Sequence, residues 1–341
     1  MATYADSGVD IEKGDAASKV AYDNAKKTFA SRKGMIGEPL QDDGGFTGAL
    51  DMGDFLLVQN DDGVGTKIEV AERIGKFDTM GYDLVAMVAD DAACVGAECI
   101  SISNTLDTNK VDASIIGPLT EGLAQACIEN KIVVPGGEIA ELGDAVNGNV
   151  WNATAVGILQ KDKRITGDNL ASGDVLIGLH SAGFRSNGFS LVRHVLKTSF
   201  GEEWHNEPYE GRGDEVTSWG EAVLTPSIIY HNLILALHGR YKEPSQVTLK
   251  GVVHVTGGGI QGNLDRILKK TDLKADLNNL PEPHEPMKKL MELGNVSEEE
   301  AYKTWNMGVG MILIISPDEQ EKTLEICQNE GYEASVIGTI Q

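Results

Sequence analysis

A short apolar run, residues 55–58, leads directly into a segment that combines acids, glycines, a hydroxyl and a lysine, Asn60–Lys67. The run predicts a strand, and Asp-Gly in the following segment predicts a turn. Carboxylates there can ligate Mg²⁺, glycines let backbone N–H groups approach a phosphate, and a lysine adds a point charge. The Walker pattern G-x-x-x-x-G-K-[ST] is absent. The segment therefore indicates a nucleotide-triphosphate site of another type; a plain polar hairpin turn is the alternative.

The composition favours a globular protein of about two domains. The chain has 341 residues, 40 of them glycine, and 41% of its residues are hydrophobic. Its formal net charge is -23, which excludes a general electrostatic attraction to nucleic acid or to anionic membranes. We attribute the surplus charge to solvated surface, so any phosphate must be bound locally, by Mg²⁺, backbone N–H groups and a few cations.

No pattern in the sequence predicts disulfides, a zinc site or insertion into a membrane. The cysteines form neither a C-x-x-C pair nor a zinc spacing with histidine, so we expect reduced thiols in or near the core: Cys94, Cys99, Cys127 and Cys327. Residues 1–10 lack the apolar stretch of a signal peptide, and no run approaches the ~18–20 apolar residues of a membrane span. A soluble, cytoplasmic protein is expected.

Strand-like and helix-like segments alternate along the chain, which predicts an α/β (α+β) fold. Helices are predicted over residues 18–29, 83–99, 115–129, 190–198, 227–237 and 318–330. Strands are predicted over residues 55–58, 131–134, 150–159, 174–179 and 252–255, and on both sides of the last helix. The polar stretch 161–173 places a domain boundary between residues 1–169 and residues 170–341.

Two further segments carry acids beside small residues. Asp90 and Asp91 lie within an apolar, helix-like stretch, and Glu138 follows the glycine pair 136–137. An uncompensated carboxylate is costly in such surroundings, and a shared Mg²⁺ would explain why several converge. The alternative for Asp90 and Asp91 is an exposed stripe of a helix.

Residues 180–188 form a polar, glycine-containing loop between a predicted strand and a predicted helix, which is where α/β folds place ligands. Backbone donors at the helix start could hold a phosphate, with Arg185 as a fork-shaped donor. An ordinary capped loop is the alternative.

A second glycine-rich segment, 257–262, matches G-x-G-x-x-G, with Asp276 at a suitable distance for a dinucleotide site. A lone fingerprint of this kind is a weak indication. His254, just before these glycines, is a candidate acid, base or substrate donor, or else a structural histidine.

Taken in order, these segments resemble the aminoimidazole ribonucleotide synthetase family, also called phosphoribosylformylglycinamidine cyclo-ligase. The resemblance covers essentially the whole chain. The matching segments are residues 4–11, 45–48, 62–67, 83–87, 96–98, 136–138, 186–193, 254–259 and 306–311. Their joint, collinear occurrence is far more specific than any one motif.

The resemblance implies a fold and a reaction. Family members have an N-terminal α/β domain whose strands form a barrel with those of a second subunit, and a C-terminal α/β domain follows. They are homodimers with active sites near the interface. ATP phosphorylates the formyl amide oxygen of formylglycinamidine ribonucleotide, the amidine nitrogen attacks the activated carbon, and phosphate leaves as the imidazole ring closes. The implied protein is thus an ATP-dependent ligase of purine biosynthesis that uses Mg²⁺.

The resemblance also implies roles for individual residues. Asp62, Asp91 and Glu138 correspond to ligands of Mg²⁺ and ATP. The remaining ATP-binding positions would be Gly63, Val64, Gly65, Thr66, Lys67 and Gly137. The candidate catalytic or substrate-binding residues are Arg185, Asn187 and His254.

The chain departs from the family pattern at several of these positions. Asp61 and Ile139 each stand where the family usually has threonine, and Asp90 stands where it usually has asparagine. Arg185 replaces the histidine of the family's G-x-H-S-N-G loop, and arginine cannot act as a base near neutral pH. The two extra acids predict more negative charge beside the polyphosphate, hence more bound Mg²⁺ or a different substrate.

The sequence leaves two other functions open. One is that of another ATP-using relative in the superfamily, which includes thiamine-monophosphate kinase, selenophosphate synthetase and the hydrogenase-maturation dehydratase. No N-terminal cysteine nucleophile for selenophosphate synthesis is visible. The other is a non-catalytic homologue that binds nucleotide and acts by association, which the exchanges at Arg185 and Ile139 motivate.

Overall fold

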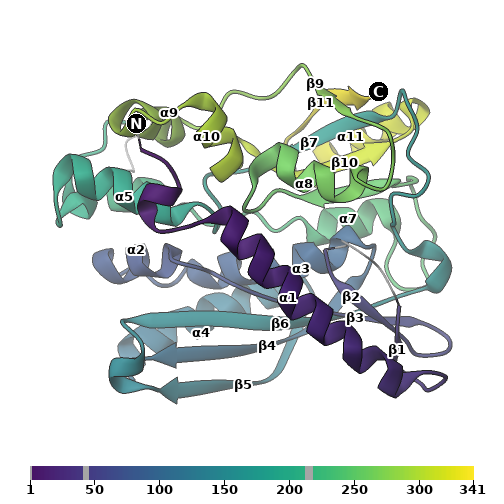
Figure 1. Cartoon of the computed structure of the whole chain (residues 1–341), viewed down its shortest axis with the longest axis horizontal. Helices are drawn as coiled ribbons and strands as arrows, with labels where there is room; N and C mark the ends of the chain where they lie inside the picture. The colour runs from purple at the N-terminus through teal and green to yellow at the C-terminus, as the bar shows by residue number, and fades with distance from the viewer. Residues whose placement is uncertain (1, 41–45, 212–217) are drawn as a thin grey trace.

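Two sheets organise the chain, one in each half (Figure 1). The computed structural model describes residues 2–40, 46–211 and 218–341, so Gly45 of one matching segment lies outside the described residues. Helices cover both sheets, and the predicted α/β fold is confirmed.

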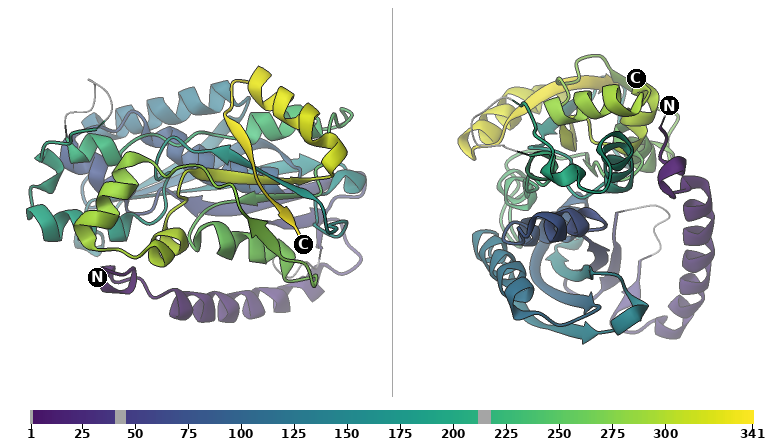
Figure 2. Two further views of the ribbon diagram at one scale, coloured as in Figure 1. Left: turned by 90° about the horizontal axis from the view of Figure 1, so that it is seen from above. Right: turned by 90° about the vertical axis from the view of Figure 1, so that its left-hand side faces the viewer.

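The N-terminal sheet has six strands; β4 and β5 are parallel neighbours, and the other neighbouring pairs are antiparallel. Across the sheet the order is β1 (Glu38–Pro39), β2 (Gly48–Asp51), β3 (Leu56–Gly63), β6 (Asn149–Leu159), β4 (Glu98–Thr108) and β5 (Val133–Glu141). The helices of this half are α1 (Ile11–Phe29), α2 (Lys67–Ile74), α3 (Met80–Cys94) and α4 (Ala113–Glu129). α3 packs on β3 and β6, whereas α1 runs along the outside of the molecule (Figure 2).

The C-terminal sheet has five antiparallel strands, and β10, which pairs with two of them, is buried along its whole length. The order is β8 (Gly251–His254), β10 (Val309–Ile315), β7 (Val175–His180), β11 (Ala334–Ile340) and β9 (Ala275–Leu277). The helices are α5 (Phe189–Phe200), α6 (Trp219–Val223), α7 (His231–His238), α8 (Gly259–Leu268), α9 (Glu285–Gly294), α10 (Glu298–Thr304) and α11 (Gln320–Asn329).

The strand that follows the apolar run is longer than the sequence predicts. β3 continues through the acidic segment to Gly63, because residues 56–63 all pair with β6. The turn predicted at Asp62 and Gly63 is therefore wrong, and so is the alternative of a hairpin there. Consecutive strand residues point to opposite faces of a sheet, so Asp61 and Asp62 are directed to opposite sides.

Three predicted helices have clearly different ends in the structure. α1 begins at Ile11, seven residues before the predicted start at Ser18. α3 stops at Cys94 instead of continuing through Cys99, since Gly96 adopts a left-handed φ of +84° and β4 begins at Glu98. α7 begins at His231 rather than at Ser227, because the residues before it bind to the other half of the molecule.

Residues 225–231, which we call the docking segment, bind two buried aspartates of α3. Asp83 and Asp90 lie seven residues apart, about two helical turns, and therefore share one face of the helix. Asp83 Oδ1 accepts the Ser227 N–H at 3.0 Å. Asp90 Oδ1 accepts the N–H groups of Tyr230 and His231 at 2.8 and 3.0 Å.

Each aspartate also has a buried cation as its partner. Lys67 Nζ lies 2.7 Å from Asp83 Oδ1 and donates to the Thr225 carbonyl at 2.6 Å. Arg185 Nη2 lies 2.8 Å from Asp90 Oδ2. The ion pair of Asp90 with Arg185 joins the two halves directly. The pair of Lys67 with Asp83 lies within the N-terminal half and is joined to the docking segment through the Thr225 carbonyl and the Ser227 N–H.

We predict that Lys67→Met lowers the free energy of unfolding by about 3–5 kcal/mol, because it leaves the Asp83 carboxylate buried without its cation. Both side chains of this pair are fully buried. Urea unfolding measures the effect, and Lys13→Met is the control, because Lys13 is exposed on α1 and should change stability by less than about 0.5 kcal/mol. Equal stability of the two variants would show that the buried pair does not support the fold.

A second prediction concerns His231, the first residue of α7. Its Nε2 accepts the Cys99 N–H at 2.9 Å, and burial lowers its pKa to about 3. The folded state thus keeps this ring neutral while the unfolded chain binds a proton below pH 6.5. Its contribution to stability is present above pH 6.5 and is lost as the pH falls toward 3, by about 1.4 kcal/mol per pH unit. In urea unfolding at pH 7 to 5, roughly the range in which free histidine titrates, His231→Gln should show a shallower loss than the unmodified protein; parallel losses would contradict the prediction.

Candidate active site

Two acidic side chains, Asp62 near the end of β3 and Asp91 on α3, form the centre of the candidate site. Burial raises the pKa of Asp62 to about 6, and the negative charge of Asp91 contributes to this rise. Burial raises the pKa of Asp91 to about 7, and its side chain is 15% exposed. The two carboxylates therefore interact electrostatically where little water reaches them.

A pair of this kind fits a divalent cation. Mg²⁺ usually keeps several waters and takes one or two carboxylates together with the phosphates of a substrate. A bound cation would offset the mutual repulsion and the burial of the two acids. Among the residues that the structure describes, no cluster of three or more His, Cys, Asp or Glu side chains could hold a metal. The binding of a cation by this carboxylate pair stays a prediction.

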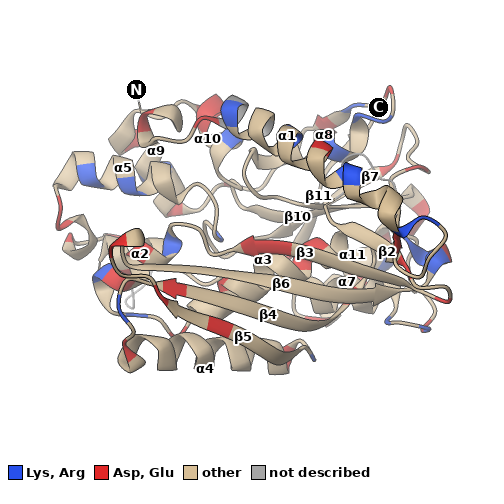
Figure 3. Ribbon diagram, turned by 60° about the horizontal axis from the view of Figure 1, so that its bottom comes forward, with Lys and Arg blue, Asp and Glu red and all other residues tan. Residues whose placement is uncertain are grey.

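Glu138, the third predicted ligand, lies away from this pair. Following the paired residues across the sheet, Asp62 lies opposite Ala153, Ala153 opposite Asn104, and Asn104 opposite Gly137. Gly137 and Glu138 are thus three strands from Asp62, or roughly 14 Å at the usual spacing of neighbouring strands. Figure 3 shows acidic positions on β5 apart from those beside β3 and α3. Within one chain, Glu138 does not join the carboxylate pair.

The residues between Asp62 and α2 divide into buried and exposed positions. Gly63 has no room for a side chain, since an added Cβ would lie 2.1 Å from the Asn152 side chain. Val64 is fully buried. Gly65 and Thr66 are exposed at the start of α2, where they line a cavity of about 580 Å³. These two residues are therefore the accessible part of the predicted phosphate-binding segment.

Lys67 lies in the interior. Its ammonium group is completely buried between Asp83 and the Thr225 carbonyl, and burial lowers its pKa. The predicted contact with ATP phosphates would require the ammonium to leave both partners. Its role as a phosphate ligand stays a prediction, and the structure assigns it a contact between the two halves.

The three predicted residues Arg185, His254 and Asp91 form a hydrogen-bonded chain. Arg185 Nη2 lies 2.9 Å from His254 Nε2, and His254 Nδ1 lies 2.8 Å from Asp91 Oδ1. His254 is fully buried, and burial lowers its pKa to about 3. With both ring nitrogens occupied, His254 is poorly placed to exchange a proton with a substrate. The histidine instead links the arginine to the candidate cation ligand.

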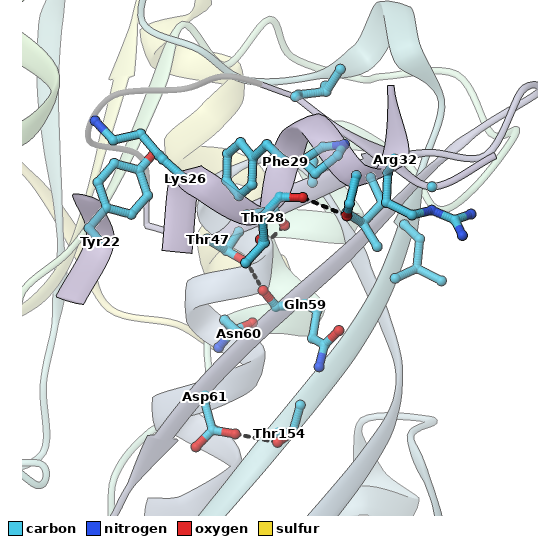
Figure 4. Close-up of a pocket in the computed structure, with 18 of the residues that line it drawn as sticks. Tyr22, Lys26, Thr28, Phe29, Arg32, Thr47, Gln59, Asn60, Asp61 and Thr154 are labelled. Atoms are coloured by element: carbon cyan, nitrogen blue, oxygen red, sulfur yellow. Dashed lines mark hydrogen bonds between the residues drawn. The ribbon is translucent and has the colours of Figure 1, made fainter. Parts of the chain in front are cut away.

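Of the two extra acids, Asp90 is neutralised by a buried cation, whereas the negative charge of Asp61 contributes to the raised pKa of Asp62. Asp90 is buried and paired with Arg185, so two departures from the family pattern are in direct contact. Asp61 is directed to the other face of β3, where it accepts a hydrogen bond from Thr154 (Figure 4). Only Asp90 is therefore neutralised within the chain, and the expectation of more bound Mg²⁺ or a different substrate stays a prediction.

Asn187 connects the two glycine-containing loops. Its Oδ1 accepts the Gly257 N–H at 3.2 Å, and its Nδ2 lies 3.7 Å from the Met87 sulfur. Asn187, a predicted substrate-binding residue, therefore lies next to the glycine-rich segment 257–262.

The strand order argues against a dinucleotide site in the second loop, which the fingerprint indicated only weakly. Asp276 lies on β9 and the glycines follow β8, and these strands form opposite edges of the sheet. An acid that far away cannot serve a ligand at the glycines. Gly259 serves packing instead, since an added Cβ there would lie 1.7 Å from the Tyr302 carbonyl oxygen.

A cavity of about 1270 Å³ lies between α1 and the outer face of β2 and β3 (Figure 4). It is lined by Tyr22 and Phe29 of α1 and by Gln59 and Asp61 of β3. Asp62 and Asp91 are absent from its lining. Cavity size alone would therefore have directed attention to the face of the sheet opposite the carboxylate pair.

Sequence reasoning missed the docking segment and the role of Asp83. The available signal was an aspartate at the start of an apolar, helix-like stretch, because such a carboxylate needs a partner if it is buried. Asp83 is fully buried in the structure. The stacking of Arg185 on Tyr230, with its guanidinium carbon 4.9 Å from the ring centre, had no counterpart in the sequence pattern.

Comparison with known proteins assigns both halves of the chain to one family. The model of "AIR synthase related protein, N-terminal domain" matches residues 42–159, and that of the corresponding C-terminal domain matches residues 171–341. The phosphoribosylformylglycinamidine cyclo-ligase of Pyrococcus furiosus is 39% identical over 340 residues, covering 100% of this chain and 95% of that protein. The enzyme of the same name from Clostridium perfringens is 38% identical over 347 residues, covering 100% and 97%.

Solved structures with lower identity share the fold. AaThiL complexed with AMPPCP and TMP has a TM-score of 0.60 at 14% identity and covers 94% of this chain and 89% of that one. T. maritima PurL complexed with FGAR has a TM-score of 0.60 at 16% identity, covering 92% and 46%. None of the helices in the described residues is long and apolar enough to span a membrane. From the two family models and the full-length relatives, we conclude that this chain belongs to the AIR synthase-related family.

Proposed function

We propose that this protein is a phosphoribosylformylglycinamidine cyclo-ligase, which converts formylglycinamidine ribonucleotide and ATP into aminoimidazole ribonucleotide, ADP and phosphate. The observation that carries the proposal is the match of the entire chain, at 35–39% identity, to proteins of that name. We also propose that the reaction takes place in the cytoplasm, where ATP and ribonucleotides are available.

The carboxylate pair suits the chemistry of this reaction. An amide oxygen leaves readily only after phosphorylation, and phosphoryl transfer needs positioning and charge neutralisation more than covalent help. We assign Asp62 and Asp91 as the residues that hold Mg²⁺, which neutralises charge on the phosphates. Gly65 and Thr66 offer exposed backbone groups at the start of α2, where an anion is favoured by the helix dipole.

The candidate catalytic residues then take different roles. Arg185 is 1% exposed and His254 is fully buried, so neither reaches a substrate in this arrangement. They instead hold Asp91 in place, since His254 bonds Asp91 and Arg185 bonds His254. Asn187 holds the two glycine-containing loops together through Gly257, and from there it can order the loops around the ribonucleotide.

We further propose a homodimer formed along β5. This strand is an edge of the N-terminal sheet, and a long, exposed apolar edge readily pairs with another chain. Val133 is 62% exposed, Val134 39% and Ile139 45%. The apolar character of Ile139 fits a buried contact, and Glu138 lies beside it. In a dimer closed along this edge, Glu138 of one subunit can complete the cation site of its partner.

The first test compares Asp62→Asn with Asp61→Asn in an assay of ADP release. We expect the unmodified protein to release ADP only when formylglycinamidine ribonucleotide is present, with an equal amount of aminoimidazole ribonucleotide. Asp62→Asn should lose activity by about 10²-fold or more, as expected for an electrostatic contribution of a few kcal/mol to the transition state. Asp61→Asn is the matched control, since it removes the neighbouring charge on the opposite face of β3.

Three outcomes would count against the proposal. ATP binding without ribonucleotide-dependent ADP release would leave a kinase-like relative or a non-catalytic binding protein. ADP release that does not depend on the ribonucleotide would point to a different substrate. Equal loss in both variants would remove the assignment of Asp62 as the cation ligand.

The dimer makes a separate prediction for mixed subunits. Asp62→Asn and Glu138→Gln should each be inactive alone. If Glu138 acts across the interface, a heterodimer of the two variants has one intact site and one site with both defects. After subunit exchange an equal mixture should recover about a quarter of the full activity, because half of the dimers are mixed. No recovery, in a mixture shown to exchange subunits, would mean that Glu138 does not act on the partner's site.

A further inference from the structure

The buried contacts of Arg185 extend to the candidate cation site. We propose that Arg185 is a positioning residue that fixes the tautomer of His254 and thereby holds Asp91 in the orientation that binds the cation. The proposal rests on the proposed function for the role of Asp91. Its geometric part is independent of that function, because it follows from the two hydrogen bonds that connect Arg185 to His254 and His254 to Asp91.

The proton positions in this chain follow from donor chemistry. A guanidinium group has only donors. The contact of 2.9 Å between Arg185 Nη2 and His254 Nε2 therefore requires Nε2 to accept. The single proton of the neutral ring is then on Nδ1, which donates to Asp91 Oδ1 at 2.8 Å. Among the described residues, the second oxygen of Asp91 has no hydrogen-bond donor as close as His254 is to the first, so it can face a ligand.

Loss of the arginine donor would remove this constraint. With the proton on Nε2 instead, His254 Nδ1 and Asp91 Oδ1 would be two acceptors facing each other at hydrogen-bond distance. The aspartate would then turn away or hold a proton of its own, and either change spoils a cation ligand. A histidine that orients a carboxylate in this way acts as outer support of a metal site, where substitutions commonly cost about 10–100-fold in affinity or activity.

The surroundings of Arg185 indicate that its inward position is enforced. Its backbone φ of +59° lies in the left-handed region that residues other than glycine rarely adopt. Its Nη1 donates to the Ile228 carbonyl at 2.6 Å, and its guanidinium group stacks on Tyr230. Asp90 supplies the counter-charge that a buried guanidinium needs. Asp90 and Arg185 thus act together: Asp90 binds the N-terminal end of α7, and Arg185 contacts His254.

A double substitution separates this role from simple stabilisation. Arg185→Met alone would leave Asp90 buried and unpaired, and it could fail to fold. Asp90→Asn together with Arg185→Met removes both charges, while the amide oxygen introduced at position 90 can still accept the N–H groups of Tyr230 and His231. The double variant should therefore fold, but it offers His254 Nε2 no donor from position 185. Arg185→Lys is the conservative variant, because its ammonium retains donors for both partners.

The main readout is the tautomer of His254, measured by ¹⁵N NMR of histidine-labelled protein without any substrate. The chain has 7 histidines, and His254→Asn identifies the relevant signals. We expect the Nδ1–H form in the unmodified protein and a shift toward Nε2–H in the double variant. Isothermal titration with Mg²⁺ and the ATP analogue AMPPCP should show affinity reduced by about 10–100-fold. Arg185→Lys should retain the tautomer and most of the affinity.

The outcomes distinguish this proposal from the proposed function. A folded double variant with an unchanged tautomer and unchanged affinity would overturn the positioning role and leave Arg185 as a purely structural residue. If the tautomer and affinity shift as expected while the unmodified protein shows no ribonucleotide-dependent ADP release, the positioning role holds and the cyclo-ligase proposal fails. Unfolding in urea, measured on the same samples, shows whether any loss comes from instability.

Discussion

The arrangement of the whole molecule depends on the burial of two aspartates on one face of α3. Asp83 and Asp90 are completely removed from solvent, and each is surrounded by donors from the other half of the chain. A buried carboxylate without such partners would cost several kcal/mol, so the halves separate only at the expense of exposing or stranding these charges. The docking segment therefore joins two sheets that share no strand.

The same helix carries the candidate cation ligand. Asp91 follows Asp90 directly, and a rotation of about 100° per residue turns it away from the docking face. Whatever fixes α3 against the C-terminal half thereby fixes Asp91 as well. Asp62 comes to it from β3, whose pairing with β6 extends as far as Gly63. The pair is thus held by a helix and a strand, not by loops, which favours a well-defined site.

Charge is distributed differently on the surface and in the interior. The chain as a whole carries a formal net charge of -23, yet Asp83 and Asp90 are each paired with a buried cation. The carboxylate pair Asp62 and Asp91 differs in its partner: the ring that bonds Asp91 is kept neutral by its own burial and brings no positive charge. Burial raises the pKa of both acids. An acidic protein that handles polyphosphates needs such a local device, because its overall field repels them.

The sequence by itself determined the alternation of strands and helices, the acidic and glycine-rich segments and the family resemblance, since periodicity, turn residues and motif order are local properties of the chain. Family resemblance grouped Asp62 with Asp91, whose charges do interact, but it also grouped Glu138 with them. Only the tertiary structure decided three other features. Glu138 lies three strands from Asp62, and Lys67 is buried against Asp83. Arg185 forms an ion pair with Asp90. These facts depend on strand order and on contacts between distant residues, such as the pair Asp90 and Arg185 at a separation of 95 positions, for which no local pattern carries information.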